Sequence, residues 1–131
     1  MSKGMNKNTS IETVKLIQGI GSGMNWNDKK NKQFIEAILV LKNENEAKLF
    51  LRDLMTESEI KEFANRLEAA RLLSRDVQYN AIIESTGLSS ATIARIAKWL
   101  KGSLGGYRLI LFRLSNNHHN SSKLGKGLLL S

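Results

Sequence analysis

The chain has 131 residues, a formal net charge of +8, and neither cysteine nor proline. This length suggests one domain with tails, and the lack of cysteine excludes a disulfide framework and thiolate chemistry. No apolar run approaches the roughly 18 residues of a membrane span, and the N-terminal segment lacks the apolar stretch of a secretory signal. We therefore expect a helix-rich cytoplasmic protein with no membrane partner.

Residues 1–27 are rich in Asn, Ser, Gly and Lys, which is typical of a flexible basic arm. A folded domain is expected over residues 28–114. Its first helix should begin at Asn27 as N-cap and run to about Lys42. The last two turns of this helix are apolar on almost every side, which indicates burial on more than one face. In so small a domain, we expect the second cover to come from another subunit.

Two further helices carry start signals. Asn43 with Glu46, and Thr56 with Glu59, have the spacing of a capping box, in which two side chains and two backbone amides bond reciprocally. Apolar residues follow Thr56 at helical intervals as far as Leu73. The sequence thus predicts one helix after Asn43 and another after Thr56.

Residues 77–101 have the pattern of a helix-turn-helix, with helices over about 77–85 and 90–101. Gly87 lies where the turn requires a positive φ, and Ser89 is a good N-cap for the second helix. The positions where two crossed helices need apolar contacts hold Ile82, Leu88, Ile93 and Ile96. In such a unit, the second helix enters the DNA major groove.

Three glycines then separate a last helix, expected over residues 107–114, from a disordered polar tail over 115–131. From residue 86 onward the chain has no carboxylate and seven cations, which are Arg95, Lys98, Lys101, Arg108, Arg113, Lys123 and Lys126. This charge distribution is typical of a protein that binds a polyanion such as double-stranded DNA. We expect phosphate contacts from Arg95, Lys98, Lys101 and Arg108.

No constellation of catalytic residues is visible. The two histidines, His118 and His119, are adjacent in the polar tail, whereas a metal site needs several ligands that converge from ordered elements. The glutamates that follow Thr56 suit a helix N-terminus. We therefore expect no enzymatic activity, no metal site and no cofactor.

Several short motifs resemble the Trp-repressor family, and most closely its Trp-repressor-like branch of the YerC/YecD type. They occur in order as LRDLMT at residues 51–56, RLEAA at 66–70, TG at 86–87, ATIAR at 91–95 and GGYRL at 105–109. The resemblance implies an all-α fold of about six helices, an intertwined homodimer and two recognition helices in successive major grooves. It also places base-reading positions at Ser89, Ser90, Ala91 and Ala94, with Asn80 near a phosphate.

The resemblance also points to a ligand pocket. Tryptophan-binding members hold the ligand between two arginines, which match Arg66 and Arg95, and two pocket threonines match Thr56 and Thr92. Here Ile96 replaces a pocket glycine and Trp99 a pocket serine, so we do not expect L-tryptophan to act as corepressor. Either the Trp99 indole partly fills a vestigial pocket, or Trp99 is an ordinary core or interface residue.

These observations favour a sequence-specific transcriptional regulator, a repressor acting by occlusion and associated with the nucleoid. One alternative is a DNA-binding protein of the replication or nucleoid type, which would contain the same helix-turn-helix. The other is a protein–protein adaptor on a degenerate helix-turn-helix, against which the carboxylate-free C-terminal third argues.

Overall fold

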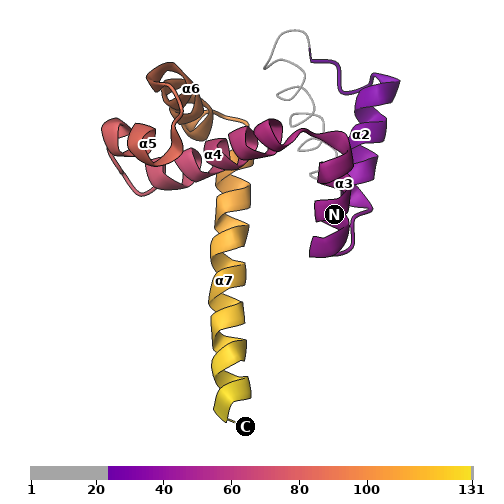
Figure 1. Cartoon of the computed structure of the whole chain (residues 1–131), viewed down its shortest axis with the longest axis vertical. Coiled ribbons are helices and arrows are strands. Elements are labelled where there is room, and N and C mark those ends of the chain that lie inside the picture. The colour runs from indigo at the N-terminus through magenta and orange to yellow at the C-terminus, as the bar shows by residue number, and fades with distance from the viewer. Residues whose placement is uncertain (1–23, 131) are drawn as a thin grey trace, which may run out of the picture. The chain divides into compact units, whose positions relative to one another are not determined.

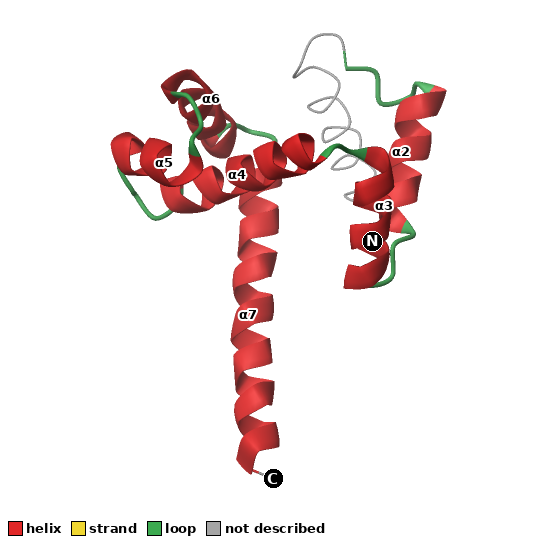
Figure 2. Cartoon of the chain, viewed as in Figure 1, coloured by secondary structure: helices red, strands yellow, loops and turns green. Residues whose placement is uncertain are grey.

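The computed structural model describes residues 24–130 and, for side chains, residues 24–118. Within this range it contains helices and connecting loops but no strand, so the prediction of an all-α fold is confirmed (Figures 1 and 2). The helices are α2 (Lys29–Leu39), α3 (Glu44–Leu54), α4 (Glu57–Leu73), α5 (Tyr79–Thr86), α6 (Ser90–Lys101) and α7 (Gly106–Leu130). Most of the predicted arm lies outside the described residues.

The chain forms two compact units that meet within α4, one ending at Ile60 and the other beginning at Lys61. The first contains α2, α3 and the first turn of α4. The second contains the rest of α4 together with α5, α6 and α7, and it holds the helix-turn-helix.

The start of α2 differs from the prediction by one residue. Asp28, rather than Asn27, is the N-cap, and its carboxylate accepts a hydrogen bond from the Lys30 amide at 3.1 Å. Asn27 instead lies inside a turn, where its amide donates to the Asn25 side chain at 3.0 Å. The helix also ends at Leu39 and not near Lys42.

Several apolar side chains of α2 are exposed among the described residues of the first unit. Phe34 is 46% exposed, Ile38 45% and Leu39 76%, and neither α2 nor α3 contains a buried residue. Burying such a surface is favourable roughly in proportion to its area. The exposure agrees with the expectation that α2 needs a cover from outside the chain.

The capping box at Thr56 is complete, whereas at Asn43 the returning bond from Glu46 goes to the preceding residue, Lys42. The Glu46 amide donates to Asn43 Oδ1 at 3.0 Å, and the Glu46 carboxylate accepts from the amide of Lys42 at 3.2 Å. At the start of α4, the Glu59 amide donates to Thr56 Oγ1 at 3.2 Å, and the Thr56 amide donates to the Glu59 carboxylate at 2.8 Å. These bonds satisfy amides that a helix start leaves without partners.

The core of the second unit lies where α4, α5 and α6 meet. Its buried residues are Ala69, Ala70, Ile82, Ile93 and Ile96, and Leu88, Tyr107 and Leu111 are among the half-buried residues that pack against them. The two alanines of α4 are completely buried in this cluster. The predicted apolar contacts of the helix-turn-helix are therefore confirmed.

The turn between α5 and α6 is stabilised by local hydrogen bonds. Gly87 ends α5 with a φ of 72°, as the sequence predicts. The buried Thr86 hydroxyl, which the sequence analysis missed, donates to the Ile82 carbonyl at 2.6 Å and accepts from the Leu88 amide at 3.3 Å. Ser89 caps α6 by accepting from the Thr92 amide at 3.1 Å.

The last helix is much longer than predicted. We expected it to end near Leu114 and a disordered tail to follow over 115–131, but α7 continues to Leu130. The sequence from Tyr107 to Leu124 contains no glycine or proline, so a polar composition alone does not interrupt its backbone hydrogen bonds. The expected domain boundary at 114 therefore falls inside a helix.

Replacing Gly87 by alanine should destabilise the second unit. An added Cβ would meet nothing within 4 Å, so the cost comes from the positive φ alone, and we expect a loss of roughly 1–2 kcal/mol in the free energy of unfolding. Gly106→Ala is the matched control, since its Cβ also meets nothing and its φ is not positive. Urea unfolding of both variants tests this, and equal stabilities would contradict it.

Candidate nucleic-acid interface

The exposed side of α6 brings most of the predicted DNA-binding residues together. Ile93, Ile96 and Ala97 are buried on the inner side of the helix. Apart from Trp99, the exposed residues of α6 are Ser90, Ala91, Ala94, Arg95, Lys98 and Lys101, which we call the reading face. Their spacing follows the three- and four-residue intervals that place side chains on one side of a helix. The face begins with small side chains and ends with cations.

The two serines at the start of α6 differ in whether their hydroxyl groups cap the helix. Ser89 Oγ caps the helix and also lies 2.9 Å from the Thr92 hydroxyl. Ser90 is exposed and is not used as the cap. A base contact from Ser89 would therefore compete with the cap, whereas Ser90 is available. Asn80 is exposed in the first turn of α5.

The cations of α6 are not neutralised by a described carboxylate. Among residues 24–118, one ion pair joins Glu44 to Lys48 on α3. Two further ion pairs, each between a glutamate and an arginine, lie on α4. One of these, Glu68 with Arg71, is bidentate at 2.6 and 2.7 Å, and its hydrogen bonds lower the pKa of the Glu68 carboxyl. The negative charge of the second unit is thus partly neutralised on α4, and the positive potential of the reading face remains.

Arg108, for which the sequence predicts a phosphate contact, also makes a hydrogen bond within the chain. Its Nη1 donates a hydrogen bond to the carbonyl of Leu100, in the last turn of α6. One donor of the Arg108 guanidinium is therefore engaged within the chain, in addition to the phosphate contact that the sequence predicts.

A hollow of about 600 Å³ lies beside α6 within the second unit. It is lined by Arg66, Arg95, Ile96, Trp99, Leu104, Gly106 and Tyr107. Four of the residues expected to form a vestigial pocket thus come together. Thr92 is instead bonded to the Ser89 cap, and Thr56 belongs to the first unit.

Trp99 lines this hollow and is 40% exposed. Both hypotheses for Trp99 stay open, namely that its indole partly fills a vestigial pocket or that it is an ordinary core or interface residue. Ile96, by contrast, is only 3% exposed and belongs to the core. Leu104, Gly106 and Tyr107 were not predicted to line the hollow, because the glycines after α6 indicate only a break between two helices.

The Arg66 guanidinium is held beside the hollow. Its Nη2 donates to Glu62 at 2.7 Å, and the group lies 5.2 Å from the centre of the Phe63 ring. Its Nε is buried and has no partner among the described residues. No carboxylate lines the hollow, and Arg66 already engages Glu62, so a ligand's ammonium group would find no free counter-charge here.

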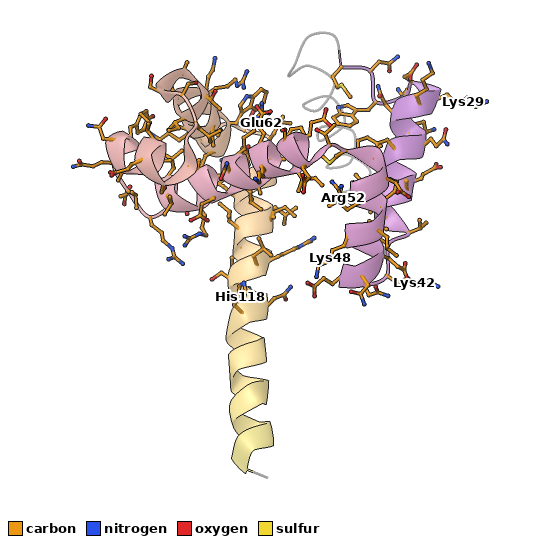
Figure 3. All side chains as sticks on the ribbon, viewed as in Figure 1. Lys29, Lys42, Lys48, Arg52, Glu62 and His118 are labelled. Atoms are coloured by element: carbon orange, nitrogen blue, oxygen red, sulfur yellow. The ribbon has the colours of Figure 1, made fainter. Side chains whose placement is uncertain are left out.

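Figure 3 shows Glu62 on α4 and His118 near the middle of α7. Within the described part of the chain, no three metal-ligating side chains come together. No helix there is long and apolar enough to cross a membrane.

Comparison with known proteins agrees with this geometry. The family described as "Trp repressor protein" matches residues 29–115. An uncharacterised protein of Bacillus subtilis, YerC, is 37% identical over 94 residues, which cover 72% of this chain and 90% of YerC.

Two crystal structures are similar to this one. A TrpR-like protein from Eubacterium eligens has a TM-score of 0.65 at 36% identity, covering 69% of this chain and 93% of that protein. A protein from Staphylococcus aureus described as a putative Trp repressor has a TM-score of 0.65 at 30% identity, covering 71% and 96%. From the extent of the family match and the near-complete coverage of these relatives, we conclude that the chain belongs to the Trp repressor family.

Proposed function

We propose that the protein is a dimeric, DNA-binding transcriptional regulator, a repressor whose α6 enters the major groove. The observation that carries this proposal is the reading face. Small and hydroxyl side chains at the N-terminal end of α6 are followed there by cations that make no ion pair with a described carboxylate. In a helix-turn-helix the N-terminal residues of the second helix contact base edges. The cations contact phosphates and fix the register.

The chemistry of the reading face suggests how a sequence would be read. Ser90 can donate or accept a hydrogen bond at a base edge, and Ala91 and Ala94 can contact a thymine methyl group. None of these is a long side chain that could bond a base in bidentate fashion. Specificity would therefore depend strongly on ordered water and on DNA shape.

The lack of long base-reading side chains on the reading face favours one alternative, a DNA-binding protein of the replication or nucleoid type with little sequence preference. Such a protein would use Arg95, Lys98 and Lys101 in the same way. The ratio of affinities for a selected site and for random duplex separates the two functions, since specific regulators typically exceed a ratio of about 10³.

A homodimer would supply the cover that α2 lacks. Phe34, Ile38 and Leu39 form an exposed apolar surface in one chain, and such a surface indicates a protein interface. A two-fold dimer would place two copies of α6 roughly 34 Å apart, one turn of DNA. We further propose that it acts in the cytoplasm, on the nucleoid.

Lys98→Ala should weaken DNA binding on every sequence and reduce its salt dependence. Each lost phosphate contact changes the slope of log K against log salt by about 0.9. Lys48→Ala is the matched control, because Lys48 lies on α3 and is paired with Glu44 at 2.9 Å. Mobility-shift assays at several salt concentrations measure both slopes. Absence of duplex binding by the wild type even at low salt would rule out both DNA-binding functions.

Ser90→Ala and Ser89→Ala should have different effects. Loss of a base contact at Ser90 should alter sequence preference by about 1–3 kcal/mol without loss of stability. Loss of the Ser89 cap should instead lower the free energy of unfolding by about 1 kcal/mol. Competition assays with variant duplexes and urea unfolding measure the two effects. An unchanged preference in Ser90→Ala would show that the proposed register of α6 in the groove is wrong.

L-tryptophan should neither bind the protein nor change its affinity for DNA. The hollow contains two guanidinium groups but no carboxylate for the ligand's ammonium group, and Ile96 and Trp99 occupy part of its wall. Calorimetric titration of the wild type and of Trp99→Ala tests this. A micromolar dissociation constant for the wild type would contradict it.

A further inference from the structure

The C-terminal end of α6 is stabilised by a side chain from the next helix. The last four carbonyls of a helix have no partner within it. The Gly102 amide satisfies the Trp99 carbonyl at 3.2 Å. The Leu100 carbonyl instead accepts from Nη1 of Arg108, which lies eight residues further along the chain.

The link between α6 and α7 is shaped so that this bond can form. Gly105 has a φ of 74°, and a Cβ added there would lie 3.0 Å from Nη2 of Arg108. A side chain at Gly105 would thus need both a strained backbone and the space that the guanidinium occupies. The link therefore requires glycine at this position for two separate reasons.

The electrostatics of this contact are favourable. The C-terminal end of a helix carries the negative end of its macrodipole, which attracts a cation. The described ion pairs do not include Arg108. The start of α7 is itself anchored, because Tyr107 and Leu111 pack against the core. A bond from Arg108 to Leu100 consequently ties the end of α6 to a fixed element.

We propose that Arg108 is a positioning residue, which fastens the C-terminal end of α6 to α7 and so sets the angle at which the reading face meets DNA. This inference rests on the proposed function and changes one part of the sequence-based expectation, in which Arg108 contacts a phosphate. Recognition would then depend on an intrachain bond that is present without any ligand in the hollow.

The first test needs no DNA. In the full-length protein, Arg108→Ala should speed hydrogen exchange of the Lys101 and Gly102 amides about five-fold, which corresponds to about 1 kcal/mol, as expected for a cation at a helix C-terminus. Arg113→Ala is the matched control, because Arg113 is exposed on the same helix. Exchange in Arg108→Ala equal to that of the wild type would overturn the proposal, whether or not the protein binds DNA.

The second test separates positioning from phosphate contact. Arg108→Ala should weaken binding about five-fold and leave the slope of log K against log salt unchanged. A phosphate contact would instead lower the slope by about 0.9. Arg108→Lys should behave like Arg108→Ala, because an ammonium group on a shorter stem does not reproduce the guanidinium geometry. A lowered slope, or full affinity in Arg108→Lys, would overturn the proposal. Failure of the wild type to bind DNA would instead refute the proposed function.

Discussion

The packing of Ile82 from α5 and Ile93 from α6 in one buried cluster with Ala69 and Ala70 is the constraint on which the helix-turn-helix depends. Both alanines are completely buried, as are Ile82 and Ile93, the largest fully buried side chains. Burial of an isoleucine side chain contributes roughly 1.5–3 kcal/mol. A larger residue at either alanine would push the two helices away from α4 and alter the turn between them.

This packing also determines which side of α6 is free. With Ile93, Ile96 and Ala97 turned inward, the helix period places the reading face outward. The core and the proposed function are thus two consequences of one helical pattern. Arg95 lies at the boundary, since it is exposed on α6 and also lines the hollow. A phosphate contact and a contact with an occupant of the hollow would compete for this side chain.

Features that depend on neighbouring residues could be predicted from the sequence. The capping boxes at Asn43 and Thr56, the positive φ of Gly87 and the Ser89 cap each follow from residue types a few positions apart. The prediction of Asn27 as N-cap was wrong, because the adjacent Asp28 can also cap a helix and the Asn27 amide is bonded to Asn25 in the preceding turn. The predicted end of the last helix near Leu114 was wrong, because a polar composition does not by itself prevent a helix from continuing.

Tertiary contacts outside the helix-turn-helix could not be predicted. The surroundings of Trp99 in the hollow include Leu104 from the link after α6 and Tyr107 from the first turn of α7. The use of Arg108 depends on a carbonyl eight residues away and on the backbone of Gly105. Charge and the family resemblance indicated a DNA-binding cation at Arg108, but neither contains information on such a bond.

Selection of binding sites from a pool of random duplexes tests the central claim most directly. A dimer that reads the major groove through two copies of α6 should enrich a two-fold symmetric sequence whose half-sites lie about 10 base pairs apart, centre to centre. The Lys98→Ala variant should enrich the same sequence with lower affinity at the same salt concentration, because a phosphate contact does not read sequence. A pool that shows no enrichment with the wild type, or enriches a single unpaired half-site, would contradict this account.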